Sequence, residues 1–155
     1  MSLIISLGTN LGNKSENLNL AKLELQKNFV LKQESTIYQS KAVDYTEQPS
    51  FLNQILEFEL PELKPISVLN IALEIEKRLG RRRDIPKGPR TIDIDILFWG
   101  LDIIDMPDLN VPHPRLFERS FIVLPLKELA FYNTLQQKFS FPQVFCNEAF
   151  PLEGI

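Results

Sequence analysis

A basic segment followed directly by two aspartates is the part of this chain whose residue types best suit phosphate chemistry. Residues 77–90, KRLGRRRDIPKGPR, hold seven lysine or arginine side chains and one acid, Asp84. Asp93 and Asp95 come next, in the segment TIDIDILFWG. Arginine forks bind phosphate oxygens, and Mg²⁺ prefers one or two carboxylates together with phosphate oxygens and water. The combination predicts a site for a polyphosphate and its magnesium ions.

The two aspartates are predicted to share one face of a β-strand. Side chains alternate along a strand, so in Thr91–Trp99 the isoleucines and Phe98 are expected on a buried face and the aspartates on the other. The aspartate Cα atoms would lie roughly 6.5 Å apart, near enough for both carboxylates to reach a shared pair of cations. The alternative is that the carboxylates only decorate a solvent-facing strand, but the neighbouring arginines favour the metal site.

The basic segment is predicted to be a lid that closes over a nucleotide. Seven basic side chains against one acid give it a net charge of +6, which leaves −9 for the rest of a chain that totals −3. Pro86 and Pro89 would restrict the backbone locally, and Gly88 would let it bend, in a loop that moves as a whole. This suits a lid that excludes water. The alternatives are a solvated loop and a nucleic-acid contact, although interleaved aromatic residues for base stacking are missing from this segment.

Two further side chains could serve the same site. Glu76 interrupts the apolar stripe of a predicted helix, so it either pairs with an arginine or lines a nucleotide pocket. His113 lies between two prolines in VPHPR, which hold its backbone extended; a structural role is the alternative for a lone histidine. Arg119 and Phe121 follow in RLFERSF and can supply a cation and an aromatic ring.

Asn53 is an amide in an otherwise apolar strand, next to the ring of Phe51. Such a pair is weak evidence for a flat heterocyclic ligand, because phenylalanine in a strand usually belongs to the core. The segment 8–15, GTNLGNKS, does not match a P-loop, which has four residues between its glycines and lysine directly after the second.

Composition favours one soluble domain spanning residues 1–155. With 44% hydrophobic and 24% charged residues the chain is typical of a globular protein. Cys146 stands alone, so no disulfide can form within the chain, and a reducing cytoplasm is expected. We find no basic leader and no apolar run of membrane-spanning length.

The order of predicted elements is β-α-β-β-α-β, which indicates an α+β, ferredoxin-like core with an antiparallel sheet and both helices on one face. Residues Leu69, Ala72, Ile75 and Leu79 are expected to face inward from the second helix. The C-terminal portion, rich in Phe and Pro, is expected to wrap this core. The predicted strands are Leu3–Leu7, Val30–Tyr38, Phe51–Leu60 and Thr91–Trp99, the helices run from Asn13 to Asn28 and from Pro65 to Gly80, residues 41–50 form a loop, and Gly100 turns the chain into a hairpin with Leu101–Asp105.

The segments KGPRTIDIDILFWG, VPHPRL and FLN make the chain similar to the 6-hydroxymethyl-7,8-dihydropterin pyrophosphokinases of the folate pathway. The resemblance covers nearly the whole length. It implies a ferredoxin-like fold and transfer of pyrophosphate from ATP to the pterin hydroxymethyl oxygen, with release of AMP. It also implies a magnesium-dependent enzyme that acts on these two small molecules, without nucleic acid or membrane. A monomer is expected, although the sequence leaves the oligomeric state open.

Site residues follow from the same resemblance. Asp93 and Asp95 would hold two Mg²⁺ ions, and with Arg81 and Arg90 they would form the catalytic set. ATP would contact Glu76, Arg83, Arg90, Ile96, His113 and Arg119. The pterin would lie between Phe51 and Phe121, with Asn53 reading its polar edge and Ser40 and Val43 completing the slot.

At three positions the chain departs from the pattern of this family. Lys87 stands where tryptophan is common before Gly-Pro-Arg, Leu73 where glutamine can occur, and Asp108 where arginine can occur. Two rival functions stay open from the residues alone. One is a non-catalytic ferredoxin-like module that binds nucleotide or RNA, and the other is a metal-dependent phosphohydrolase.

Overall fold

The computed structural model describes residues 1–41, 50–80 and 91–152. Along the chain the elements are β1 (Ser2–Thr9), α1 (Lys14–Gln26), β2 (Leu31–Glu34), β3 (Tyr38–Ser40), β4 (Phe51–Glu59), α2 (Pro65–Arg78), β5 (Asp93–Trp99), β6 (Ile104–Met106), β7 (Leu109–Val111), the 3₁₀ helix η1 (Pro114–Glu118), α3 (Ser120–Leu126), α4 (Phe131–Leu135) and β8 (Ala149–Pro151). In these ranges no helix is both long and apolar enough to span a bilayer.

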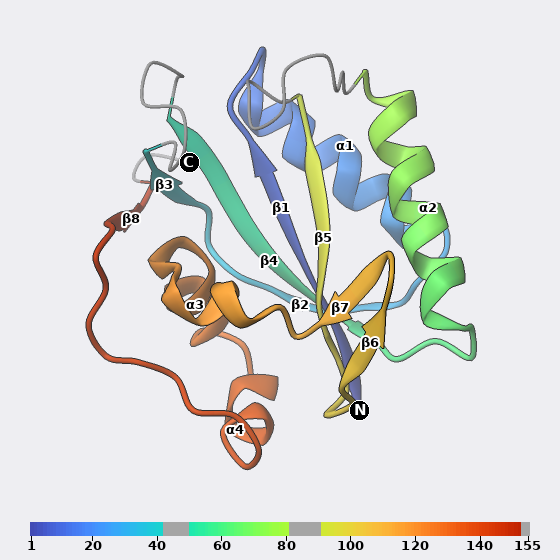
Figure 1. Cartoon of the computed structure of the whole chain (residues 1–155). Coiled ribbons are helices and arrows are strands. Elements are labelled where there is room, and N and C mark those ends of the chain that lie inside the picture. Colours follow the sequence, from blue (N-terminus) through green and yellow to red (C-terminus); the bar gives the residue numbers. More distant parts are fainter. Residues whose placement is uncertain (42–49, 81–90, 153–155) are drawn as a thin grey trace.

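The main sheet confirms the predicted ferredoxin-like core. Its strands run in the order β5-β1-β4-β3-β8, with β2 also paired to β4, and every pairing is antiparallel. Helices α1 and α2 cover one face, and α3 and α4 lie over the other (Figure 1). Strand β5, which carries the aspartates, is therefore at one edge of the sheet and pairs with the central strand β1.

Local chemistry explains the two long helices. Asn13 caps α1 by accepting a hydrogen bond from the Glu16 amide (3.2 Å), and α2 begins at Pro65, whose fixed φ suits a first helical position. The buried residues of α1 are Leu18, Ala21 and Leu25, and those of α2 include Val68, Ala72 and Ile75. Of the four residues predicted to face inward from α2, Ala72 and Ile75 are buried as predicted. Leu69 and Leu79 are only partly buried.

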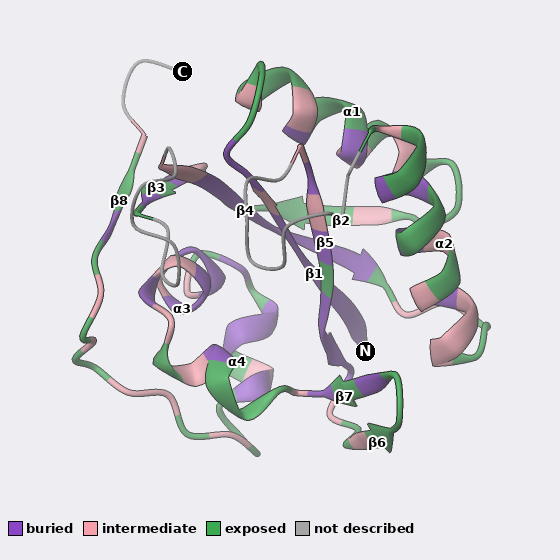
Figure 2. Cartoon of the chain, turned by 45° about the horizontal axis from the view of Figure 1, so that its top comes forward, coloured by how far each residue is buried: buried purple, intermediate pink, exposed green. Residues whose placement is uncertain are grey.

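A second core lies on the other face of the sheet and confirms that the C-terminal portion wraps the fold. Phe139 and Phe141 pack against Phe98 and Phe117, with ring centroids 5.2 to 6.3 Å apart, and Tyr132 packs against Phe141 at 4.9 Å. Figure 2 shows buried residues on both sides of the sheet and mostly exposed ones along the chain that leads to β8. Aromatic packing of this kind stabilises beyond simple area burial, so the C-terminal portion is an integral layer.

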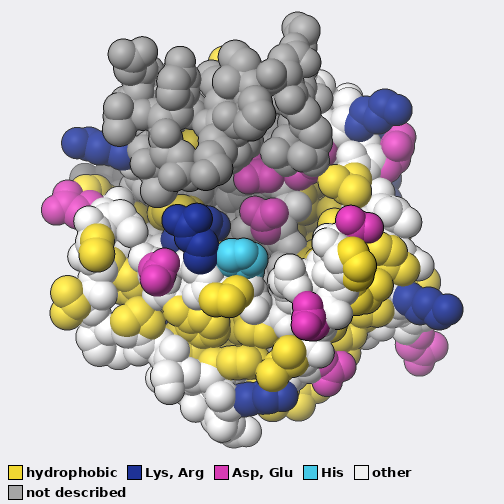
Figure 3. Space-filling model, in the orientation of Figure 1, with side chains coloured by type: hydrophobic (Ala, Val, Ile, Leu, Met, Phe, Trp, Pro, Cys, Tyr) yellow, Lys and Arg dark blue, Asp and Glu magenta, His cyan; other side chains and the backbone are white. Residues whose placement is uncertain are grey.

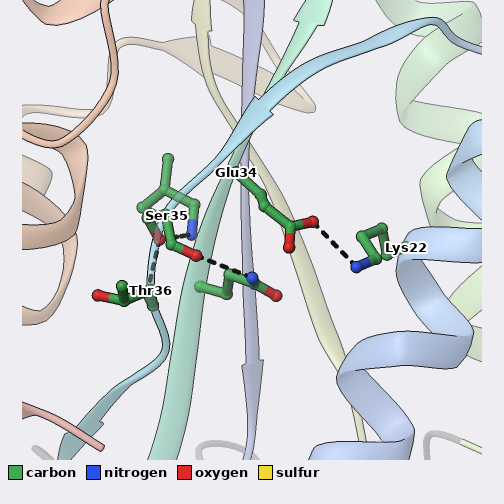
Figure 4. A network of polar contacts seen from close by, with 6 residues as sticks. Lys22, Glu34, Ser35 and Thr36 are labelled. Atoms are coloured by element: carbon green, nitrogen blue, oxygen red, sulfur yellow. Dashed lines mark hydrogen bonds and ion pairs between the residues drawn. The ribbon is translucent and has the colours of Figure 1, made fainter. Parts of the chain in front are cut away.

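One predicted strand, Val30–Tyr38, is broken into β2 and β3 at Ser35. The Ser35 hydroxyl accepts the Ile55 amide (2.9 Å) and donates to the Thr36 carbonyl (2.8 Å), while its own amide donates to the Ile55 carbonyl (2.9 Å). Figure 4 shows this network beside the ion pair of Lys22 and Glu34. A side chain therefore takes over one backbone bond to β4, and the strand bends there.

The face assigned to Phe98 was wrong. The pairing of β1 with β5 shifts between Ile4 and Ile5, so Leu97 is an extra residue in β5. A bulge of one residue reverses the alternation. Consequently the isoleucines of this region lie in the core under α1 and α2, whereas Phe98 lies in the aromatic core on the opposite face.

The predicted hairpin after Gly100 was also wrong in its pairing. Only an isolated bridge joins Trp99 to Asp102, and the hairpin that forms is that of β6 with β7. This hairpin contacts β5 and supplies one wall of the site described next.

Candidate active site

Asp93 and Asp95 lie on one face of β5, as the alternation predicts. Asp93 is opposite Gly8 of β1 and Asp95 is opposite Ser6, before the bulge changes the register. Asp93 is half-buried and Asp95 is exposed. Two carboxylates are thus held at one end of the edge strand, with Asp95 open to a ligand.

Gly8 joins this acidic pair to the amide of β4. A Cβ atom at Gly8 would lie 3.4 Å from Asn53 Oδ1, 3.7 Å from the Phe51 ring and 4.0 Å from the Asp93 Cβ. Glycine inside a strand often marks a close approach, and here it leaves the space between three predicted site residues open. The sequence marked Gly8 as the end of the first predicted strand and as part of the failed P-loop match, so its role between the strands was missed, although an isolated glycine after an apolar run was the available signal.

Asn53 is held rigidly. It is buried, and its Nδ2 donates a hydrogen bond to the Ser40 hydroxyl (2.8 Å) on the neighbouring strand β3. The structure therefore brings together two of the predicted pterin residues. Phe121 lies on α3, which packs against both β3 and β4.

A pocket of about 340 Å³ opens beside Asp95. It contains four predicted site residues, namely Asp95, Ile96, His113 and Arg119. Figure 3 shows acidic, basic and histidine side chains gathered at the centre of this face, above a band of hydrophobic ones. The remaining lining residues are Leu69, Ile94, Leu97, Pro107, Asp108, Leu109, Asn110, Leu116 and Ile122.

His113 is the N-cap residue of the 3₁₀ helix η1 and is oriented by it. The His113 Nδ1 accepts a hydrogen bond from the Arg115 amide (3.2 Å), so the proton of the neutral ring is on Nε2. The exposed ring can then donate Nε2–H to an oxygen in the pocket. An anionic oxygen is the natural acceptor for such a donor.

Glu76 is fully inside the protein, with only 2% of its surface exposed. Its Oε2 accepts a hydrogen bond from the Ile94 amide at 2.7 Å. Ile94 lies between the two aspartates, on a strand that has no partner on its outer side among residues 1–41, 50–80 and 91–152. Neither sequence interpretation of Glu76, an arginine partner or a pocket wall, anticipated this contact, which fixes the backbone that carries the carboxylates.

Removing this contact is expected to destabilise the fold. Glu76→Ala should lower the free energy of unfolding by about 1–3 kcal/mol, because the Ile94 amide is left buried without its acceptor. Glu76→Gln, which keeps an oxygen acceptor, should lose less. Urea denaturation measures both, with the exposed Glu74→Ala on the same helix as the matched control. Equal unfolding free energies for Glu76→Ala and Glu74→Ala would contradict the assigned contact.

Two tyrosines of the second face have altered acidity. Burial, followed by the hydrogen bond and the negative charge of Glu128, raises the pKa of Tyr38 to about 12. Burial also raises the pKa of Tyr132. Both phenols stay neutral near pH 7, so they contribute no charge to the site.

Four predicted site residues lie outside the described residues: Val43, Arg81, Arg83 and Arg90. The lid prediction for the basic segment and its Lys87 falls there as well. Among the residues that are described, no group of three or more His, Cys, Asp or Glu side chains is placed to hold a metal by itself.

Comparison with known proteins gives one family. Residues 4–131 match the family described as 7,8-dihydro-6-hydroxymethylpterin-pyrophosphokinase (HPPK). A 2-amino-4-hydroxy-6-hydroxymethyldihydropteridine pyrophosphokinase from Bacillus subtilis is 38% identical over 81% of this chain and 75% of its own length. A folic acid synthesis protein from Pneumocystis carinii is 41% identical, also over 81% of this chain, but the match spans only 17% of that larger protein.

Solved structures agree on the fold. An HPPK-DHPS in complex with substrates superposes with a TM-score of 0.61 at 15% identity, covering 88% of this chain and 43% of that one. A Plasmodium falciparum HPPK-DHPS triple mutant with pteroate gives a TM-score of 0.59 at 15% identity, covering 81% and 39%. The family match and the Bacillus relative, on a fold that holds paired aspartates beside a buried amide, lead to one conclusion: the chain belongs to the 7,8-dihydro-6-hydroxymethylpterin-pyrophosphokinase family.

Proposed function

We propose that this chain transfers pyrophosphate from ATP to the hydroxymethyl oxygen of 6-hydroxymethyl-7,8-dihydropterin and releases AMP. The observation that carries the proposal is the meeting of two unlike subsites across Gly8. The carboxylates of β5 lie on one side of it, and the buried amide of Asn53 on the other. A phosphate donor and a heterocyclic acceptor can then meet at the end of β1.

Asp93 and Asp95 would together bind magnesium, and we propose that two ions bind there. Their oxygens are the hard ligands that Mg²⁺ prefers, and two carboxylates leave coordination positions for phosphate oxygens and water. Magnesium, when bound there, neutralises the phosphates and polarises the bond that breaks. The exposed Asp95 and the half-buried Asp93 need no rearrangement of the core to serve as ligands.

The pocket beside Asp95 suits the nucleotide. Leu69, Ile96 and Leu109 give it apolar wall for a base, while His113 and Arg119 offer donors to phosphate oxygens. Arg119 would stabilise negative charge as it shifts towards the leaving AMP. Arg81, Arg83 and Arg90 are proposed to add further guanidinium contacts to the phosphates. Glu76 is proposed to hold β5, which lines the nucleotide pocket, through its hydrogen bond to the Ile94 amide.

The pterin is proposed to bind on the β4 side of Gly8. The Asn53 amide offers both a donor and an acceptor, which matches the alternating polar edge of a pterin. Its bond to Ser40 restricts rotation of the amide before the substrate arrives. Phe51 and Phe121 would sandwich the ring, and Val43 would complete the slot.

A non-catalytic nucleotide- or RNA-binding module is the alternative, and one assay separates the two. Purified protein is incubated with MgATP, with and without the hydroxymethyl pterin, and AMP is quantified. We expect AMP only when the pterin is present, together with the pterin diphosphate. Absence of AMP in both reactions would favour the binding module. Equal AMP in both reactions would favour a phosphohydrolase.

A further inference from the structure

The C-terminal strap, residues 140–152, ties together two walls of the proposed site. It runs from α4 to β8 along the outside of the molecule (Figure 1). In β8, Ala149 pairs with Ser40, and the Leu152 amide donates to the Ile37 carbonyl (2.8 Å). The strap lies beyond residues 4–131, which are the part of the chain that matches the family. The family match therefore assigns no role to the strap.

Asn147 of the strap holds the backbone on both sides of Arg119. Its Oδ1 accepts hydrogen bonds from the Ser120 amide (2.9 Å) and from the Ser120 hydroxyl. Its Nδ2 donates to the Glu118 carbonyl (3.0 Å). A single side chain thus clamps the residues before and after the pocket arginine.

Asn147 provides a hydrogen-bond acceptor that the start of α3 lacks. Arg119 is the N-cap residue, a position where Ser, Thr, Asp or Asn normally accepts a hydrogen bond from the first turn. A guanidinium group has donors only, so Arg119 cannot cap, and no capping bond from its side chain is present. An arginine kept there to bind phosphate leaves the first turn without an acceptor from the cap side chain. Asn147 supplies that acceptor from 27 residues further along the chain.

We propose that Asn147 is a positioning residue for Arg119 and Phe121, and that the strap is part of the active-site framework. The proposal rests on the proposed function, because it assigns those two side chains to the substrates. Asn147 stands two residues from Ala149, whose partner Ser40 orients Asn53. The strap therefore sets the start of α3 relative to the β3–β4 wall of the pterin slot.

Steady-state kinetics of Asn147→Ala test the proposal. The KM values for ATP and for the pterin should rise about tenfold because Arg119 and Phe121 contact the substrates, and kcat should fall as well because Arg119 also stabilises the charge that shifts towards AMP. Asn147→Asp keeps the acceptor for Ser120 but loses the donor to the Glu118 carbonyl, so it should recover only part of the affinity. The exposed Asn133→Ala, on α4, is the matched control and should behave as wild type. If Asn147→Ala does not fold, Ser120→Ala removes only the hydroxyl contact and should shift both KM values in the same direction.

Unchanged KM values in a folded Asn147→Ala would overturn the proposal. A lower melting temperature with unchanged KM values, not rescued by Asn147→Asp, would assign the strap a merely structural role and overturn it equally. If the wild-type protein forms no pterin-dependent AMP, the proposed function fails. Amide hydrogen exchange then tests separately whether Asn147 holds the start of α3. Faster exchange at residues 118–122 in Asn147→Ala, absent in Asn133→Ala, supports it, and unaltered exchange refutes it.

Discussion

Asp95→Ala is expected to lower kcat by about 10³-fold or more, which corresponds to on the order of 4 kcal/mol of lost transition-state stabilisation. Asp95 is exposed and lines the pocket, so its carboxylate can meet a metal ion and a polyphosphate directly. Without it, a highly charged substrate would be only partly compensated in a partly desolvated site. Single-turnover and steady-state assays of AMP formation measure the loss.

The fold should survive this substitution, because an exposed side chain contributes little to the core. Circular dichroism melting is expected to give a curve close to that of the wild type. Asp105→Ala, which removes an exposed aspartate from β6, is the matched control and should keep kcat within about threefold. Near-normal turnover of Asp95→Ala would remove Asp95 from the mechanism.

Asn53→Ala is expected to weaken pterin binding by about 100-fold, as the loss of two hydrogen bonds of ordinary strength predicts. Its amide is buried and already fixed by Ser40, so little ordering is needed when the ligand binds. Binding of a nonhydrolysable ATP analogue should change by less than about threefold, because the pocket beside Asp95 is separate from this amide. Calorimetric titration of each ligand gives both numbers.

Two variants sharpen this result. Ser40→Ala leaves the amide in place but frees its rotation, so its effect on pterin affinity should be smaller than that of Asn53→Ala. Gln39→Ala removes an exposed amide from the adjacent position of β3, which points to the opposite face, and should leave pterin affinity unaltered. Equal losses for pterin and nucleotide in Asn53→Ala would indicate general damage and contradict a pterin-reading role.

Local periodicity allowed much of the core and the acidic pair to be predicted. The alternation of TIDIDI placed both aspartates on one face, and the Asn13 cap of α1 and Pro65 of α2 marked where these helices begin. The bulge at Leu97 could not be predicted, because it depends on how β5 pairs with a strand more than ninety residues earlier. The same is true of the break at Ser35, where the hydroxyl meets an amide of β4.

Contacts between distant residues explain what was missed in the site. Glu76 caps an edge-strand amide 18 positions away, and Asn147 caps a helix 27 positions away. The residue type alone predicts neither role, because a glutamate or an asparagine can form hydrogen bonds with many different groups. Gly8 could be identified in the sequence, but its role depends on the neighbouring strands, which bring Asp93 and Asn53 next to it.

Crystals grown with Mn²⁺ and a nonhydrolysable ATP analogue test the central claim most directly, because anomalous scattering locates the metal independently of the protein density. We predict metal ions in contact with the carboxylates of both Asp93 and Asp95 and with the phosphates of a nucleotide in the adjoining pocket. Nucleotide bound with its metal elsewhere, and both carboxylates turned to solvent, would contradict the proposed chemistry.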